Sequence, residues 1–178
     1  MEVPVADLCK VIINLTGEKE SRQGINETLE FLRVIFSIDI ISIFRIHTDT
    51  TQILVDQDFR CTCKNHSVNP LLQNAPIEIL TPGWLAGMKD GRIIYEHVKN
   101  LSQPARTFFE TINTATIVTI PIMHDDFMYG YLALNSHREK DWEYEELEVI
   151  KMFTGVIALV LYKNRLKEEN TLLNIEVF

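Results

Sequence analysis

The sequence predicts an α+β domain in which a central antiparallel sheet of five to six strands has N- and C-terminal helices packed on one face. Two observations support this fold class. Apolar residues recur with helical periodicity at both ends of the chain, and β-branched and aromatic runs broken by short polar turns lie between them. A chain of 178 residues is long enough for one domain with a substantial core, and short for two.

Two helices are predicted before the first strands. Apolar residues at i, i+3, i+4 and i+7 predict a helix over residues 8–15, with Asp7 as its N-cap and Gly17 as its stop. The same periodicity predicts a second helix over residues 24–37. Residues 39–59 are β-branched and aromatic on both sides of a polar TDTT stretch, which indicates two strands joined by a tight turn.

The middle of the chain is less regular. Residues 61–75 show no periodicity and are expected to form a loop, followed by a short strand over residues 76–80. Residues 81–91 indicate a turn, a short helix and a glycine stop, and residues 92–98 another short strand. Residues 102–114 predict a helix with a proline in its first turn, where the missing N–H costs little.

A second hairpin and a long helix are predicted at the C-terminal end. Residues 115–123 and 129–136 indicate two strands around the turn HDDF. The long helix follows, with Asp141 as the expected N-cap. Glutamates follow within its first turn, where the positive end of the helix dipole favours them.

Composition narrows the classes of function. A formal net charge of −8 and a pI near 5.1 argue against nucleic-acid binding, which usually needs a basic face. The apolar run at residues 152–162 is too short to span a bilayer, which needs about 20 residues. The N-terminal segment has no basic or apolar region of the secretory type, so we expect no secretion signal. Three cysteines without disulfide spacing are typical of a reducing compartment. We therefore expect an acidic cytoplasmic protein that binds neither nucleic acid nor membranes.

Four segments, taken in order, resemble a GAF domain over roughly residues 20–165. The family's first hairpin is matched by DIISIFRIHTDTTQILV and its glycine-containing middle by PGWLAGMKDGRIIYEHV. Its closing hairpin is matched by TIVTIPIMHDDFMYGYLALNS and its terminal helix by DWEYEELEVIKMFTGVIALVLYKNRL. The resemblance implies a GAF/PAS-like sheet with a small-molecule pocket on the face away from the helices. It divides the chain into an N-terminal helix (1–19), the GAF domain (20–162) and a signalling or coiled-coil extension (163–178).

The resemblance also implies a function. It indicates a non-catalytic sensory or regulatory module of a cytoplasmic signalling protein, which binds a small molecule, mediates dimerisation, or does both. In a longer parent protein the output domain would be one such as a histidine kinase or a cyclase. No nucleophile, base and orienting group occur in a recognisable order, so we expect no turnover. The sequence leaves the ligand and any cofactor unknown.

Two ligand classes of the family are not matched by this sequence. The stretch NSHREKDWEYEEL lacks, in register, the lysine and the Asp-Glu pair that cyclic-nucleotide-binding GAF domains carry there. Residues 81–114 contain no cysteine, whereas bilin-binding GAF domains commonly attach their chromophore through one in this region. We therefore expect neither a cyclic nucleotide nor a bilin attached in that segment.

Strand alternation and the resemblance together predict a ligand site. Alternation places Ser42, Phe44 and Ile46 on one face of their strand. The resemblance implies that a small polar residue there, an aromatic on the next strand and a hydroxyl before the fifth strand contact the ligand, with two further aromatics as walls. The predicted ligand-binding residues are Ser42, Phe44, Phe59, Trp84, Tyr95 and Thr114. The alternative is that all of them are core or rim residues.

Cys61, Cys63 and His66 form a C-x-C-x-x-H cluster. Thiolate and imidazole suit zinc or iron, but a structural zinc site needs four ligands, usually with wider cysteine spacing. We therefore expect reduced thiols in or beside a loop, and no metal site. Two alternatives stay open: a redox-sensing thiol pair, and a thiol-based redox enzyme on the same fold that uses the two cysteines.

The last predicted helix carries two apolar stripes. One is assigned to the sheet and core: Ile150, Phe153, Ile157 and Val160. The other recurs at alternating three- and four-residue steps, which is typical of a coiled-coil seam. We expect it to form a parallel homodimer, with the interface residues Met152, Gly155, Leu159, Tyr162, Leu166 and Leu173. The alternatives are a ligand-free dimerisation domain, and a helix buried wholly within one subunit against the first helix.

Overall fold

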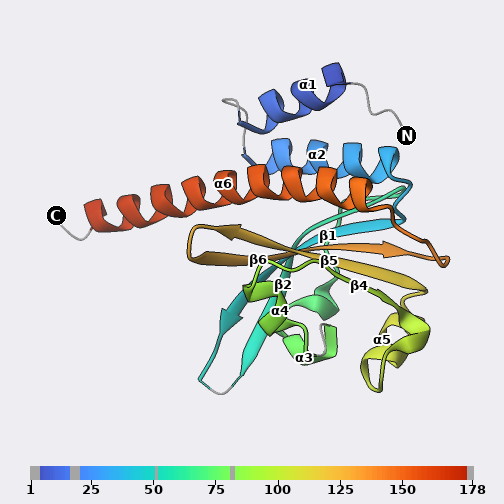
Figure 1. Ribbon diagram of the computed structural model, residues 1–178. Coiled ribbons are helices and arrows are strands. Elements are labelled where there is room, and N and C mark those ends of the chain that lie inside the picture. The colour runs from blue at the N-terminus through green and yellow to red at the C-terminus, as the bar shows by residue number, and fades with distance from the viewer. Residues whose placement is uncertain (1–4, 17–20, 51, 81–82, 176–178) are drawn as a thin grey trace.

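Figure 1 shows a computed structural model of the chain, which describes residues 5–16, 21–50, 52–80 and 83–175. Its helices are α1 (Val5–Thr16), α2 (Ser21–Ile35), α3 (Ile77–Leu80), α4 (Leu85–Lys89), α5 (Ala105–Thr111) and α6 (Tyr144–Ile175), with short 3-10 helices η1 (Pro70–Leu72) and η2 (Val98–Asn100). Its strands are β1 (Ile40–Thr48), β2 (Ile53–Thr62), β3 (Ala75–Pro76), β4 (Ile94–His97), β5 (Thr116–His124) and β6 (Phe127–Ser136).

The six strands form one sheet in the order β3-β2-β1-β6-β5-β4, and every neighbouring pair is antiparallel. Helices α2 and α6 cover one face, and α1 lies on the outer side of α2 (Figure 1). The short helices α3, α4 and α5 cover the opposite face (Figure 1). The predicted α+β class, the strand number and the packing of the terminal helices on one face are confirmed.

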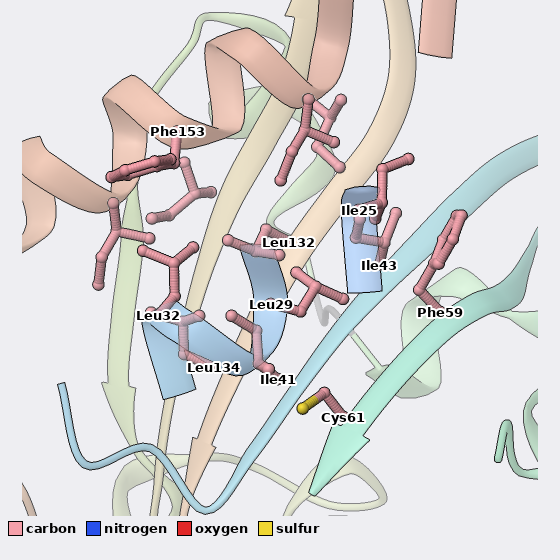
Figure 2. Packing of buried hydrophobic residues seen from close by; sticks show 14 of the residues in the cluster. Ile25, Leu29, Leu32, Ile41, Ile43, Phe59, Cys61, Leu132, Leu134 and Phe153 are labelled. Atoms are coloured by element: carbon pink, nitrogen blue, oxygen red, sulfur yellow. The ribbon is translucent and has the colours of Figure 1, made fainter. Parts of the chain in front are cut away.

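The main core lies between the sheet and the helices α2 and α6. Leu29 of α2, Leu132 of β6 and Phe153 of α6 are fully buried there and lie close together (Figure 2). Burying side chains of this size stabilises the fold by about 1.5–3 kcal/mol each. Leu15 joins α1 to the same core. The inner stripe predicted for the last helix is confirmed, because all four of its residues are buried: Ile150, Phe153, Ile157 and Val160.

A β-bulge in the β1–β2 pair decides which side chains of β2 face which layer. Ile43 pairs with Phe59 but Phe44 pairs with Gln57, which leaves Asp58 as an extra residue. Directly paired residues point to the same face of a sheet. Phe59 therefore follows Ile43 into the core beneath the helices, whereas Gln57 follows Phe44 to the opposite face.

A second bulge in the β5–β6 pair leaves Tyr129 as an extra residue between Met128 and Gly130. The shift brings the backbones of β6 and β1 very close, because a Cβ added to Gly130 would lie 1.8 Å from the Phe44 carbonyl oxygen. It also breaks the alternation of β6. Tyr129 packs toward the helices and Tyr131 toward the opposite face, although they are two residues apart.

One predicted strand is a helix. Residues 76–80 were expected to be extended, but only Ala75 and Pro76 pair with β2, and the next four residues form α3. Ile77 and Leu80 are both buried on the sheet face opposite α6. Side chains three apart share a side of a helix but not of a strand, which explains the helical turn. The loop predicted from residue 61 begins later, since β2 continues to Thr62.

Two predicted helix caps are also wrong. Helix α1 begins at Val5, so Asp7 lies inside its first turn, and Gly17 lies outside the described residues. Helix α6 begins at Tyr144 rather than directly after Asp141. Its first turn is closed by the Glu143 backbone N–H, which donates to the Glu146 carboxylate at 3.2 Å, as in one half of a capping box. The other predicted helices and strands are confirmed, with boundaries moved by a few residues.

Helix α6 extends past the sheet toward the C-terminus (Figure 1). Its 32 residues make it the longest described element, at roughly 48 Å by the usual rise per residue. Beyond Leu161, none of its residues whose side chains are described is buried. No helix among the described residues is long and apolar enough to cross a membrane.

Candidate ligand-binding cavity

A cavity of about 60 Å³ lies on the sheet face opposite α2 and α6. Its sheet side includes Ser42 and Phe44 of β1 and Ala133 of β6. Its other side is closed by apolar residues from η1, α3 and α5, among them Leu80 and Phe108. This is the face on which the family resemblance places a small-molecule pocket.

A chain of hydrogen bonds crosses the sheet side of the cavity. The Gln57 side-chain amide donates to the Ser42 hydroxyl at 3.1 Å, and its carbonyl oxygen accepts from the Asn69 backbone N–H at 2.6 Å. Ser42 and Gln57 are almost completely buried. Because the Ser42 hydroxyl accepts in this bond, its own proton remains available to a ligand. These bonds hold β1, β2 and the start of η1 in place around the cavity.

Tyr131 provides a polar group that the protein itself does not satisfy. It lines the cavity, is 1% exposed and stacks on Phe44 with ring centroids 5.0 Å apart. Its hydroxyl finds no hydrogen-bond partner among the described residues, and burial raises its pKa. A buried hydroxyl without a partner costs about 1–3 kcal/mol, and such groups are rare in folded proteins.

Two predicted site residues lie near the cavity without lining it. Thr114 is buried behind a lining residue, Asn135, and its hydroxyl accepts a hydrogen bond from the Asn135 side-chain amide at 3.2 Å. Asn135 itself lines the cavity. Trp84 packs against the apolar clusters on this side of the sheet and lies outside the lining.

Two other predicted ligand residues, Phe59 and Tyr95, lie on the opposite face. Phe59 packs in the core beneath the helices (Figure 2), with the Arg22 guanidinium 4.7 Å from its ring centroid. Tyr95 pairs with Val118, which faces the helices, and its hydroxyl donates to the Lys140 carbonyl oxygen at 2.9 Å. Sheet register places both rings away from the cavity, so the expectation that they line a pocket is corrected.

Five polar residues of the cavity were missed from the sequence: Gln57, Arg60, Asn69, Tyr131 and Asn135. Strand alternation could have identified two of them, because Tyr131, Ala133 and Asn135 share one face of β6. Gln57 could not be found in this way. It reaches the cavity face only because the bulge at Asp58 shifts its register.

None of the three cysteines lines the cavity. Cys63 and Cys9 are exposed, whereas Cys61 is buried on the helix side of the sheet (Figure 2). Burial and the neighbouring Glu30 carboxylate raise the pKa of the Cys61 thiol to about 12. Because nucleophilic cysteines are thiolates, a protonated buried thiol does not favour the redox-enzyme alternative.

No family model matches this chain. The methanogenesis regulatory histidine kinase FilI of Methanothrix harundinacea (strain 6Ac) is 24% identical over 151 residues. The matched part is 83% of this chain but only 17% of that kinase, so the chain spans a small part of this relative's length.

Solved structures identify the fold. The phycocyanobilin-bound GAF domain from a cyanobacterial phytochrome aligns with a TM-score of 0.77 and 15% identity, covering 94% of this chain and 98% of that one. The GAF domain of a two-component sensor histidine kinase from Bacillus halodurans aligns with a TM-score of 0.64 and 16% identity, covering 81% of this chain and 95% of that one. The chain therefore folds as a GAF domain, as its sequence predicted. GAF domains of this architecture occur in phytochromes and in sensor histidine kinases.

Proposed function

We propose that this chain is a non-catalytic sensory GAF domain that binds a small molecule in the cavity beside β1 and β6. The observation that supports this most strongly is Tyr131, which lines the cavity and whose buried hydroxyl has no partner among the described residues. A ligand with a hydrogen-bond acceptor would satisfy it. The Ser42 and Gln57 pair supplies a second, pre-organised polar contact.

The size and lining of the cavity limit the ligand. A volume of about 60 Å³ is well below the roughly 300–1,000 Å³ of pockets that hold drug-sized molecules. We infer a compact ligand with an apolar body and one or two polar groups directed at Tyr131 and Ser42. A larger ligand would require α3 and α5 to move away from the sheet.

We also propose that the domain belongs to a longer cytoplasmic sensor protein, with a histidine kinase as the output domain. The proposal is supported by the likeness to FilI and to the Bacillus halodurans domain, both named as histidine kinases. Ligand occupancy would act by changing the preferred position of α6, the element that leaves the domain.

We propose that two copies associate in parallel through the outer stripe of α6. Met152, Leu159 and Leu166 are 47%, 50% and 41% exposed. Among the described residues, packing does not require a glycine at Gly155, because a Cβ there would meet no atom within 4 Å. Tyr162 contributes less to the interface, since its ring packs on His124 of the same chain, with ring centroids 4.6 Å apart. The side chain of Leu173 lies outside the described residues.

A thermal-shift screen of small metabolites tests the cavity. We compare the wild type with Tyr131→Phe and with the matched control Tyr129→Phe, whose hydroxyl lies outside the cavity. Binding stabilises the folded state by mass action, by about 2.7 kcal/mol when the ligand is at 100 times its dissociation constant, and so raises the melting temperature. A true ligand stabilises the wild type and the control, and stabilises Tyr131→Phe much less. A screen without hits, or hits that ignore Tyr131, would contradict the proposed site.

Analytical ultracentrifugation tests the dimer. Leu159→Glu combined with Leu166→Glu places charges in the proposed seam, so it should lower the association state while leaving the circular dichroism spectrum unchanged. Val34→Glu, at a position 58% exposed on α2, is the matched control and should leave association intact. A wild-type protein that sediments as a monomer at micromolar concentration would overturn the proposal.

A further inference from the structure

Three metal-ligating side chains converge outside the cavity, where α2 meets the end of β2. They are the carboxylate of Glu30, the thiol of Cys61 and the imidazole of His66, and their ligand atoms all lie within 4.8 Å of one another. The three residues come from a helix, a strand and the following loop, so the fold and not the local sequence brings them together. The cysteine-histidine spacing alone gave no reason to include Glu30.

The three groups differ in solvent exposure, from the buried core to the surface. Cys61 is fully buried and lies beside the apolar core in Figure 2, Glu30 is 41% exposed, and His66 is exposed. The Cys61 thiol donates to the Glu30 carboxylate at 2.9 Å. His66 and Glu30 also line an open hollow beside α2. Glu30 and His66 therefore form the open side of the site, and Cys61 forms its core side.

We propose that Glu30, Cys61 and His66 bind a divalent transition-metal ion, for which zinc is the best match, with water in the fourth position. Sulfur, imidazole nitrogen and carboxylate oxygen are the three ligand types that zinc takes, at about 2.3, 2.0–2.1 and 2.0–2.2 Å. Three donors around such an ion lie roughly 3–4 Å apart by this geometry, so the observed spacing needs only small side-chain rotations. The thiol proton passes to solvent as the sulfur–metal bond forms.

Arg33 competes with the metal ion for the Glu30 carboxylate. Its guanidinium donates two hydrogen bonds to Glu30, at 2.9 Å and 2.6 Å, and places a positive charge beside the site. A bound ion must share the Glu30 carboxylate with this cation. Removing the charge should therefore tighten metal binding. A purely structural chain of Arg33, Glu30 and Cys61 predicts no such gain.

Titration of the reduced full chain with Co²⁺, followed by Zn²⁺ competition, tests the site. Wild type should bind a single equivalent of Co²⁺ with a thiolate-to-cobalt absorption band that Zn²⁺ removes. Cys61→Ser should lose the band. His66→Ala, at an exposed position that leaves folding intact, should weaken binding at least about 10–100-fold, the range that loss of an outer-shell partner already costs.

Three further variants make the result decisive. Cys63→Ser and Cys9→Ser, at the two exposed cysteines, should retain the band. Arg33→Gln should bind Co²⁺ more tightly than the wild type. The proposal is overturned if the wild type shows no thiolate band, if the band depends on Cys63 or Cys9, or if His66→Ala binds as tightly as the wild type.

Discussion

The two faces of this sheet are built from the same six strands but differ in how completely they are packed. Beneath α2 and α6, Leu29, Leu132 and Phe153 belong to one continuous apolar core. On the opposite face, the short helices leave a cavity of about 60 Å³. Two buried hydroxyls on that side, of Tyr131 and Thr119, have no partner among the described residues. The first face stabilises the domain, and the second keeps an unsatisfied hydroxyl on a cavity-lining residue, Tyr131.

Two tyrosines of β6 show the same difference at the scale of single atoms. Tyr129, on the helix side, donates its hydroxyl to the Asp58 carboxylate, which also accepts from Arg45 at 3.1 Å. The hydroxyl of Tyr131, on the cavity side, has no partner in the described part of the chain. The bulge at Tyr129 is what separates them. A single extra residue thus gives neighbouring phenols opposite roles.

The largest expected effect comes from truncating the packed face. Phe153→Ala should lower the free energy of unfolding by about 3–5 kcal/mol, because it leaves a new cavity in a fully packed core. Phe108→Ala, beside the existing cavity, should cost less, since its ring already borders empty space and is only partly buried. Urea denaturation measures both values. Equal losses would contradict the difference between the faces.

The next effect separates the two tyrosines. Tyr129→Phe should lose about 1.5–3 kcal/mol, the usual contribution of a hydrogen bond to a charged group. Tyr131→Phe should leave the ligand-free stability unchanged or raise it by up to about 1 kcal/mol, because it removes an unsatisfied hydroxyl. Paired denaturation curves measured without ligand decide this. A substantial loss in Tyr131→Phe would mean that its hydroxyl has a partner after all.

A smaller effect distinguishes the two stripes of α6. Gly155→Ala should stabilise the isolated chain by about 1 kcal/mol, because alanine favours a helix interior and has open space here. The same change should weaken the proposed dimer, in which two backbones approach at this position. Chemical denaturation at low protein concentration, combined with sedimentation at high concentration, measures both. Tighter association in the variant would exclude a close contact at Gly155.

Much of the fold could be predicted because its signals are local. The two hairpins carry alternating β-branched residues around polar turns, and the inner stripe of α6 has the spacing of a helix that faces a core. Residues 76–80 could not be assigned in this way. Their helical turn depends on Ile77 and Leu80 reaching the same apolar cluster, which is a tertiary effect.

The candidate site was predicted only in part, for a reason of register. Alternation placed Ser42 and Phe44 correctly on the cavity side, because both lie on β1, which carries no extra residue in its pairing with β2. The family resemblance, not alternation, assigned Phe59 to the ligand site, and the extra residue at Asp58 places Phe59 and Gln57 on opposite faces. A bulge has no clear sequence signature here. Side chains beyond it are therefore assigned to the wrong face.

The smallest expected effect lies at the polar edge of the packed face and depends on pH. Hydrogen bonds from Arg33 lower the pKa of Glu30 from 4.5 to about 2. A carboxylate with a lowered pKa in the folded state stabilises the fold above its unfolded pKa, and this contribution is lost as the pH falls from about 4.5 to about 2. Glu30 is 41% exposed and screened by solvent, so the contribution should not exceed about 1 kcal/mol.

Glu30→Gln removes this contribution at every pH. The difference in unfolding free energy between the wild type and Glu30→Gln should therefore be largest near neutral pH and should shrink between pH 4.5 and 2. Added salt should reduce it further, because exposed ion pairs are screened. Urea denaturation at several pH values, with Glu110→Gln as an exposed helical control, measures the difference. A difference that stays constant across this range would show that Glu30 stabilises the helix side by packing and not by its charge.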